Sequence, residues 1–408
     1  MTQIDKKQLL NYSILIPYLI LSVLGLIVVY STTSVTMVQY GLNPFRSVIN
    51  QGVFWIISLI GIAFIYRLKL NFLRKPTVVS MVILIEILLL IIARVFGEEV
   101  NGARGWIMLG PLSFQPAEYL KIIIVWFLAF TFSRRQQSIA QKDYQALTKG
   151  TFLPKTFRDW RTYTAILIGL VAMQPDLGNA SIIVLTAIVL FSVSGIGYRW
   201  FVSLILTIVI SSTLLLGSIS VIGVDKVAKV PVFGYVAKRF KAFYNPFEDL
   251  TDSGHQLANS YYAMSNGGWF GRGLGNSIEK NGYLPEAQTD FVFSIVIEEL
   301  GLIGASLILA LVFFLILRIF LVGIKARNPF NSMVALGLGA MMLMQVFVNI
   351  GGISGLIPST GVTFPFLSQG GNSLLVLSIA VGIVLNIDAT EKREKLTQEI
   401  EEELYEVF

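Results

Sequence analysis

Four carboxylates gather within 14 residues where a polar segment meets an apolar one: Glu286, Asp290, Glu298 and Glu299. A general base needs a carboxylate that reaches a hydroxyl and whose pKa is raised by partial burial or by nearby charge. Asp290 stands at the boundary itself, so it is the main candidate for that role. Asp is also a common helix N-cap, but capping needs only one of the four acids. The cluster therefore indicates acid–base chemistry, with capping by Asp290 as the structural alternative.

A second group of polar residues surrounds the start of the apolar segment 118–133. Glu118 and Lys121 are three residues apart, so they share one face of a helix. They form either a local ion pair at a helix start or a charged patch that faces a polar cavity. Arg104 lies in the loop before them. Asp176, in the string QPDLGN, is expected mainly to cap the helix that follows it.

A third group follows Asn349 and contains Thr360 and Ser368 in a run rich in Pro and Gly. Proline and glycine interrupt a helix here beside an apolar segment. Backbone freed at membrane depth must be satisfied internally or line a wet cavity. The run is therefore expected to form a shaped loop that contributes to a site rather than to carry out catalysis itself.

Several kinds of site are excluded or disfavoured by composition. The chain has no cysteine, which rules out disulfides, thiolate metal sites and a cysteine nucleophile. His255 is the only histidine, so a multi-histidine metal site is excluded and acid–base chemistry falls to carboxylates. The glycines around Arg272 resemble a phosphate-loop fragment, but no strand precedes them, so a dinucleotide site is not expected.

The elements that position these residues are expected to be transmembrane helices. The chain of 408 residues is 54% hydrophobic, has a mean hydropathy of +0.71 and carries 14% charged residues, against roughly 25% in soluble proteins. A helix that crosses the hydrocarbon needs about 20 apolar residues. We predict an all-α polytopic membrane protein with about ten transmembrane helices, centred on 13–31, 50–66, 77–95, 118–133, 162–174, 179–195, 200–223, 290–321, 331–351 and 368–387.

The distribution of basic residues predicts the orientation of these spans. With the N-terminus inside, the short outer loops and their edges hold only Arg46, Arg94 and Arg104. Basic residues prefer cytoplasmic loops, so both termini are predicted to be cytoplasmic. This topology also explains the net charge of +6 without nucleic acid. We expect one transmembrane domain over 1–388, with a large outer loop at 224–289 between helices 7 and 8, and an acidic cytoplasmic tail over 389–408.

The eighth span and the loops carry two further expectations. The span at 290–321 is longer than one crossing needs, so its start is expected to be tilted or only partly immersed. No strand-rich segment is expected. The polar clusters then fall in or beside the outer loops at 96–117, 174–178, 224–289 and 352–367, which predicts a working surface on the outer face of the membrane.

Four strings occur in order along the chain: NGARGWIMLGPLSFQPAEYLK, QPDLGNA, YLPEAQTDFVFSIVIEELG and PSTGVTFPFLSQGGNS. In this combination the chain resembles the SEDS family (shape, elongation, division and sporulation) over nearly its whole length. LPEAQTDF and the EELG that follows are more similar to the cell-division branch than to the elongation branch. The family usually has Arg-Trp where this chain has Arg104, Gly105 and Trp106, which weakens a role for Arg104, and usually has Tyr in place of Gln369.

The resemblance implies a ten-helix bundle and a peptidoglycan glycosyltransferase that polymerises lipid II, a disaccharide-pentapeptide on undecaprenyl pyrophosphate. The family's key aspartate corresponds to Asp290, and its QPxE…K residues correspond to Glu118 and Lys121. Cations are needed where charge develops on the leaving pyrophosphate. The candidates are Lys121, Arg104, Arg272 and Lys280, or a divalent ion such as Mg²⁺ or Mn²⁺. Residues expected to line the substrate site further include Glu286, Asn349, Thr360 and Ser368.

Three functional hypotheses are compared. A polymerase is expected to act at the division septum of a bacterial cell membrane, with a class B penicillin-binding protein transpeptidase and other division membrane proteins as partners. A lipid II transporter should need contacts at both membrane faces, whereas the motifs here cluster on one. A scaffold without enzymatic activity would bind its partner regardless of the cavity residues. The resemblance favours the enzyme, and an elongation-type polymerase is its nearest alternative.

Overall fold

The computed structural model describes residues 6–100, 103–110, 112–148, 159–222, 239–247 and 253–407. Its helices match the ten predicted spans in order. Three short helices (α3, α6 and α7), the longer α13 and the 3-10 turn η1 lie between or before them. The helices with their bounds are η1 Lys6–Leu9, α1 Tyr12–Gln39, α2 Arg46–Arg67, α3 Leu70–Leu73, α4 Pro76–Phe96, α5 Pro116–Ser133, α6 Gln136–Lys142, α7 Gln145–Thr148, α8 Trp160–Met173, α9 Leu177–Val193, α10 Tyr198–Ile222, α13 Ser253–Gly267, α14 Val292–Lys325, α15 Pro329–Ile353 and α16 Gly371–Val407.

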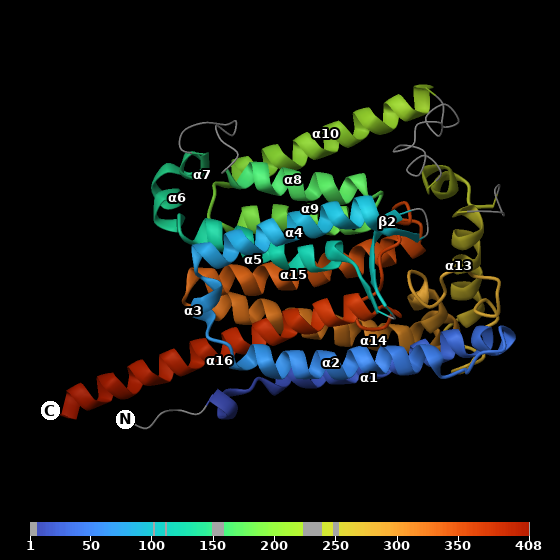
Figure 1. Cartoon of the computed structure of the whole chain (residues 1–408), viewed down its shortest axis with the longest axis horizontal. Helices are drawn as coiled ribbons and strands as arrows, with labels where there is room; N and C mark the ends of the chain where they lie inside the picture. The colour runs from blue at the N-terminus through green and yellow to red at the C-terminus, as the bar shows by residue number, and fades with distance from the viewer. Residues whose placement is uncertain are drawn as a thin grey trace.

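The bundle is built from helices that run side by side, with both chain ends at the same end (Figure 1). We call the opposite end, which carries β2 and α13, the distal end. Seven of the described helices are long and apolar enough to cross a membrane, and α8 and α9 are shorter apolar helices. Together with α10 they confirm the predicted all-α polytopic architecture. Of the long loop predicted at 224–289, the structure describes 239–247 and 253–289.

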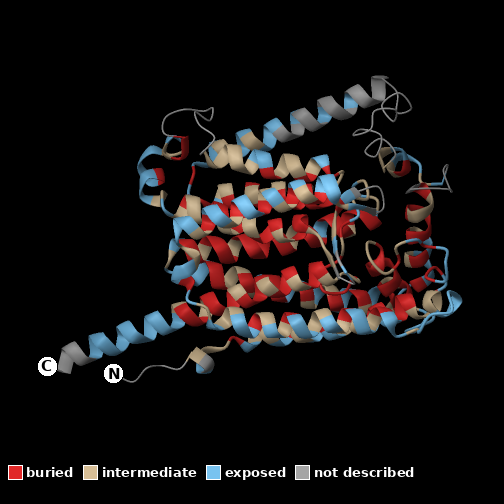
Figure 2. Ribbon diagram, in the orientation of Figure 1, coloured by how far each residue is buried: buried red, intermediate tan, exposed pale blue. Residues whose placement is uncertain are grey.

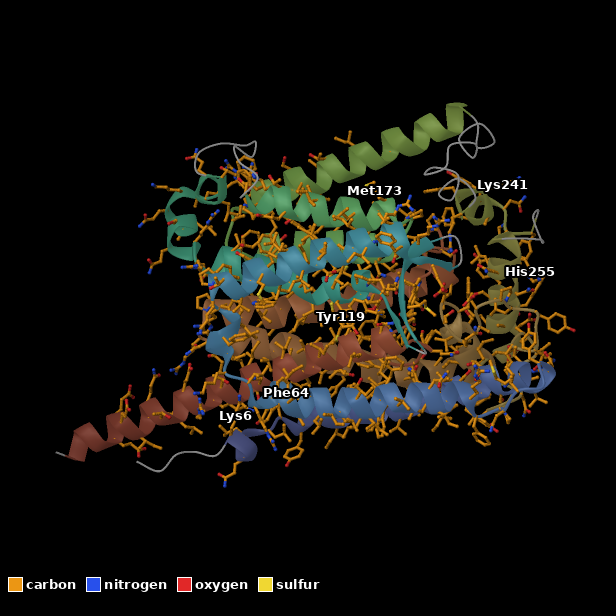
Figure 3. All side chains as sticks on the ribbon, in the orientation of Figure 1. Lys6, Phe64, Tyr119, Met173, Lys241 and His255 are labelled. Carbon is orange, nitrogen blue, oxygen red and sulfur yellow. The ribbon has the colours of Figure 1, made fainter. Side chains whose placement is uncertain are left out.

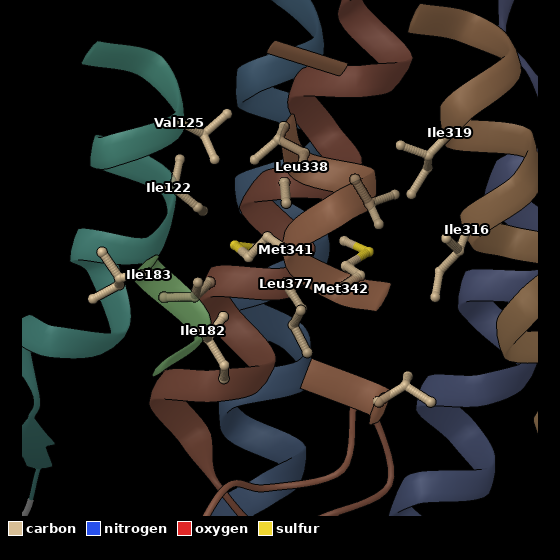
Figure 4. Packing of buried hydrophobic residues seen from close by; sticks show 14 of the residues in the cluster. Ile122, Val125, Ile182, Ile183, Ile316, Ile319, Leu338, Met341, Met342 and Leu377 are labelled. Atoms are coloured by element: carbon tan, nitrogen blue, oxygen red, sulfur yellow. The ribbon is translucent and has the colours of Figure 1, made fainter. Parts of the chain in front are cut away.

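Burial separates the central helices from those that face lipid. In Figure 2 buried residues concentrate on α5, α14, α15 and α16, whereas α2 and α4 present exposed faces. Those exposed faces are apolar, with Ile60 and Phe64 on α2 and Leu88 on α4. An apolar surface of this kind is what a lipid-facing helix requires. The core of the bundle is drawn in Figure 4, where α15 contributes Leu338, Met341 and Met342 among side chains of α5, α9, α14 and α16.

The predicted absence of strands is wrong for the loop before α5. Three short antiparallel strands form there: β1 Glu98–Val100, β2 Ala103–Leu109 and β3 Leu112–Phe114, in the order β1-β2-β3. The pairing is local, since Val100 lies opposite Ala103 and Leu109 opposite Leu112. Hairpins this short leave little periodicity in a sequence, so the segment was not recognisable as strand.

The long eighth span is confirmed as one helix in the chain but contains a sharp break. Gly301 has φ 71° and ψ 176°, a conformation outside the helical region that is essentially restricted to glycine. The segment before it is almost entirely buried, and the segment after it crosses the bundle. The helix therefore begins with a short buried arm, and the predicted tilt or partial immersion of its start stays a prediction.

Candidate functional site

Asp290 lies in a narrow pocket at the distal end, between the end of α15 and the loop 359–362. The pocket has a volume of about 10 Å³, the space of about one water molecule. Its lining includes Asp290, Asn349 and Thr360, three residues that the sequence placed in two separate groups. Thr360 Oγ1 is buried and has no hydrogen-bond partner among the described residues. The pocket therefore brings a carboxylate and an unsatisfied hydroxyl together.

The backbone of Asp290 is held by a single side chain. Asn349 Nδ2 donates to the carbonyl of Asp290 at 2.7 Å and to that of Val362 at 2.6 Å. One amide thus ties the start of α14 to the pocket loop. The N-cap of α14 is Phe291, and no described side chain makes a capping hydrogen bond there. The capping alternative for Asp290 is therefore wrong, and its carboxylate is available to the pocket.

Arg239 is the charged neighbour of Asp290 that the sequence did not single out. Its Nη1 donates to the carbonyl and hydroxyl oxygens of Ser359, at 2.8 and 3.0 Å. A methyl group built on Gly361 would lie 3.3 Å from Asp290 Oδ2 and 3.7 Å from Arg239 Nη2, so both groups flank this glycine. Arg239 belongs to the long loop, where basic residues carry no topological signal, and no motif marks it.

The pKa of Asp290 is raised to about 7. Burial is the largest cause, because it disfavours the charged carboxylate. Arg239 opposes this effect and lowers the pKa, whereas Glu286 and Asp176 raise it further. A carboxylate with a pKa near neutrality can accept a proton and give it up again at physiological pH, which is the property that a general base needs.

Asp176 brings α9 against the same pocket. It caps α9 as predicted, since Oδ1 accepts from the backbone N–H of Asn179 at 3.0 Å. Its Oδ2 accepts from Gln115 Nε2 at 3.0 Å, which joins α9 to the start of α5. A methyl group on Gly178 would lie 2.8 Å from the carbonyl oxygen of Thr360. The start of α9 therefore touches the pocket loop, and burial raises the pKa of Asp176.

Glu118 and Lys121 form the ion pair that their spacing predicts. Glu118 Oε2 and Lys121 Nζ are 2.8 Å apart, and both side chains are buried on α5. Their charges also act on Asp176, with Glu118 raising its pKa and Lys121 lowering it. The pair therefore lies within electrostatic range of the acid that in turn acts on Asp290. The structure confirms the ion pair, whereas a charged patch that faces a polar cavity stays a prediction, because neither residue lines the pocket of Asp290.

Two more of the predicted residues position the pocket rather than face it. Ser368 Oγ donates to the carbonyl of Thr289 and accepts from the N–H of Phe364, both at 2.7 Å. Glu286 accepts from the hydroxyl of Thr289 at 2.6 Å and has a positive φ of 56°. These hydrogen bonds hold the hydroxyl and the carbonyl group of Thr289, the residue directly before Asp290.

The remaining predicted cations lie apart from the pocket lining. Lys280 is buried and pairs with Glu299 at 2.6 Å, and it donates to Ser31 at 3.0 Å. Arg272 is exposed, and its Nε donates to the carbonyl of Asn276 at 3.3 Å. Arg104 is an exposed residue of β2. Figure 3 draws the described side chains of the chain, with Lys241 and His255 labelled at the distal end.

The donor set of the described residues does not by itself fit a metal ion. No group of three or more His, Cys, Asp or Glu residues comes together in the part of the chain that the structure describes. Asp176 and Asp290 influence each other electrostatically, but two acids provide fewer ligands than Mg²⁺ requires.

Comparison with known proteins agrees with this geometry. The family described as cell cycle protein, named for FtsW, RodA and SpoVE, matches residues 12–393. The chain belongs to this family. It is 49% identical to a probable peptidoglycan glycosyltransferase FtsW of Lactococcus lactis subsp. lactis, over 97% of this chain and 96% of that protein. It is 38% identical to the stage V sporulation protein E of Bacillus subtilis, over 94% of this chain and 98% of that protein.

Solved structures of family members share the fold. A chain from a peptidoglycan synthase complex that coordinates polymerization and crosslinking superposes with a TM-score of 0.71, at 24% identity over 94% of this chain and 98% of that chain. The rod shape determining protein RodA of Thermus thermophilus gives a TM-score of 0.61, at 22% identity over 94% and 97%. The chain therefore shares its fold with these two proteins.

Proposed function

We propose that the chain is a peptidoglycan glycosyltransferase that polymerises lipid II, with Asp290 as its general base. The observation that carries this proposal is the position of Asp290. Its carboxylate lines a narrow pocket together with Asn349 and Thr360, its pKa is about 7, and Arg239 stands beside it. The names of the relatives, which include probable peptidoglycan glycosyltransferases, support the same reaction.

The proposed reaction transfers a glycan from one lipid-linked sugar to another. Asp290 takes the proton from the 4-hydroxyl of the acceptor N-acetylglucosamine. The freed oxygen attacks the anomeric carbon of the donor N-acetylmuramic acid, and the bond from that carbon to undecaprenyl pyrophosphate breaks. The linkage inverts from α to β-1,4. General base catalysis of this kind contributes on the order of 10²–10⁴-fold.

The leaving pyrophosphate gains negative charge, and cations near the pocket stabilise it. Arg239 and Lys121 are the two cations that the structure associates with the acids of this site. Arg239 is held by Ser359, so its guanidinium is already oriented. A divalent cation, if it takes part, would need phosphate oxygens of the substrate among its ligands, because the described side chains do not complete a coordination sphere. We derive no step through it.

Membrane embedding explains how the substrates meet. The polyprenyl tails of donor and acceptor remain in the bilayer while their sugars reach the pocket, so binding removes translational freedom. Holding two reactants in this way supplies up to about 7–11 kcal/mol in favourable systems. The charge pattern of the loops supports a position of this pocket on the outer face of the membrane.

Asp290→Asn and Asp290→Ala test the proposal. Purified wild-type protein, supplied with lipid II and its cognate transpeptidase, is expected to make glycan strands, and both variants are expected to make none while keeping the wild-type melting temperature. Glu394→Gln, a change of an exposed acid on α16, is the control and should polymerise normally. Strand synthesis by Asp290→Asn would contradict the general base.

The transporter remains the second candidate. If wild type makes no strands but moves lipid II across vesicles, transport replaces polymerisation as the function.

We propose further that the enzyme acts at the division septum with a class B penicillin-binding protein. One of the similar solved structures comes from a peptidoglycan synthase complex that coordinates polymerization and crosslinking, which supports such a partner. Its relatives named FtsW favour division over elongation.

A further inference from the structure

A buried amide side chain lies on α2, a helix with an exposed apolar face (Figure 2). Gln51 is 3% exposed, whereas Ile49 and Ile56 on the same helix are 58% and 54% exposed. A buried amide needs hydrogen-bond partners, because an unpaired one destabilises the fold. Gln51 belongs to none of the polar motifs of the sequence, so its partners in the structure are the guide to its role.

Both polar groups of this amide bind the loop that precedes α16. Nε2 of Gln51 donates to the carbonyl of Ser368 at 3.4 Å, and its Oε1 accepts from the N–H of Gly370 at 3.2 Å. Phe54, one turn further along α2, packs against the end of the same loop, because a methyl group on Gly371 would overlap its ring. One side chain thus ties α2 to two backbone groups of the loop, and a second supports the contact.

The same loop also holds the chain that leads into Asp290. The N–H of Gln369 donates to the carbonyl of Gln288 at 2.8 Å. The hydroxyl of Ser368 donates to the carbonyl of Thr289 at 2.7 Å. Both acceptors lie within two residues of Asp290 in the chain. The loop therefore constrains the backbone at the point where it enters the pocket.

One peptide group connects the two sets of hydrogen bonds. The carbonyl of Ser368 and the N–H of Gln369 belong to the same planar trans peptide, so they point in opposite directions. Gln51 binds the carbonyl, and Gln288 binds the N–H. Rotation of this peptide would break both bonds, and hydrogen bonds in such a chain strengthen one another. Gln51 therefore helps to fix the peptide that holds the segment before Asp290.

We propose that Gln51 is a positioning residue for polymerisation, which acts through the loop 368–370 to keep the Asp290 carboxylate in its reactive place. This inference rests on the proposed function of Asp290 as general base. A general base must lie within hydrogen-bond reach of the hydroxyl that it deprotonates. Displacement of a reacting group by about 1 Å can lower a rate on the order of 100-fold. Gln51 does not line the pocket itself, so its effect is transmitted by the loop.

Gln51→Met tests the proposal, because it keeps the length of the side chain and removes both hydrogen bonds. Trp55→Phe is the matched control. It also removes a side-chain hydrogen bond of α2, but that bond joins Trp55 Nε1 to Ser22 of α1 at 2.9 Å rather than to the loop. Initial rates of lipid II consumption are measured against lipid II concentration, with the cognate transpeptidase present. Gln51→Met should lower kcat on the order of 10- to 100-fold with little change in KM, and Trp55→Phe should keep both wild-type values.

Hydrogen–deuterium exchange of the full chain distinguishes this inference from the proposed function. Gln51→Met should speed exchange in the segments 286–291 and 368–371 by about tenfold at an unchanged melting temperature, because local opening becomes easier. Trp55→Phe should leave both segments unchanged. If the wild type makes no strands while exchange differs as expected, the polymerase is refuted, but the link from Gln51 to the segment before Asp290 stands.

Three results would overturn the positioning role. These are a wild-type kcat in Gln51→Met, equal losses of kcat in Gln51→Met and Trp55→Phe, and unchanged exchange in Gln51→Met. Gln51→Asn keeps the amide but is one methylene shorter, so it cannot reach both backbone groups of the loop. It is measured in the same way, and it decides the question with the same expected outcomes if Gln51→Met does not fold.

Discussion

At the scale of single residues, the site depends on how Asp290 is surrounded. Burial raises the pKa of its carboxylate and Arg239 lowers it, and the balance is a value of about 7. Asn349 holds the backbone, so the side chain is free for chemistry. The environment, rather than the residue type, makes this aspartate suitable as a base at neutral pH.

The pH dependence of polymerisation follows from this balance. The base acts when ionised, so the initial rate should rise with pH, reach half its maximum near pH 7 and level off above it. Arg239→Gln removes the charge that lowers the pKa of Asp290, and the midpoint should therefore move to higher pH. Initial rates of lipid II consumption between pH 5.5 and 9 measure both curves. A midpoint that is unchanged in Arg239→Gln would contradict the assignment.

The contribution of Asp290 to the free energy of unfolding should fall with pH, whereas the polymerisation rate rises. The pKa of Asp290 is higher in the folded than in the unfolded chain, so ionisation opposes folding as the pH rises from about 4 through 7. Asp290→Asn cannot ionise, so the contribution of this residue to the loss of stability in that range should disappear. This is why the inactive variant is expected to stay folded.

Gly361→Ala, compared with Gly41→Ala, distinguishes the effect of a changed pocket geometry on activity from the effect of backbone strain. Gly361 has φ +78°, and its methyl group would press between Asp290 and Arg239. Gly41 has φ +68° and no described atom within 4 Å of the added methyl group. Each alanine should cost roughly 1–2 kcal/mol of stability through its positive φ, but only Gly361→Ala should abolish polymerisation. Equal activity of the two variants would show that the pocket tolerates the methyl group.

Part of this site could be predicted from the sequence alone. Glu118 with Lys121 and the cap at Asp176 follow from local spacing, and the structure confirms both contacts. Asn349 and Thr360 were recognised as polar residues near a loop, but their meeting with Asp290 depends on packing between helices. Arg239 could not be found, since nothing in its neighbours distinguishes it from the other basic residues of the long loop.

At the scale of elements, α14 organises the distal end because it is broken. The break exposes backbone groups, and the segment 267–273 makes hydrogen bonds to them. Glu298 and Glu299 bind the loop 277–280, through the N–H of Ile278 and the side chain of Lys280. The excess length of this span was visible in the sequence. The position of the break was not, because Gly301 is one of 35 glycines and nothing in the sequence distinguishes it from the others.

Lys280→Met should destabilise this arrangement strongly. Lys280 and Glu299 are buried, with side-chain exposures of 2% and 4%, and removal of one partner leaves an uncompensated charge. Such changes cost about 3–5 kcal/mol. The double variant Lys280→Met with Glu299→Gln removes both charges and should recover part of the loss. Thermal unfolding in one detergent compares the three proteins, and a wild-type melting temperature for Lys280→Met would show that the pair is not structural.

At the scale of the whole molecule, ten helices were predictable because an apolar run of sufficient length leaves few alternatives in lipid. The acidic tail over 389–408 was predicted to lie outside the last transmembrane span. In the structure, α16 continues without interruption through this tail to Val407. Glu391 anchors the start of this extension, accepting from the N–H of Arg327 and from Asn331 Nδ2. The residues after it are exposed as far as the structure describes their side chains.

Truncation after Arg393 should therefore leave the bundle intact. The variant keeps Glu391 and the ion pair between Lys392 and Asp388, and it removes one exposed hydrogen bond, from Arg327 Nη1 to Gln398. Because that bond is exposed, we expect an unchanged melting temperature and unchanged polymerisation in vitro. A loss of either would mean that the extension supports the bundle.

The continuity of α16 has a consequence for the charge it carries. A rigid helix holds its acids at a fixed height above the bilayer. Glu401 stands about 20 Å along the axis from Asp388, the first charged residue after the apolar part of α16. The Debye length at physiological ionic strength is about 8 Å. The acids from Glu401 onward are thus screened from charges at the bilayer surface, and they are presented to the surrounding solution instead.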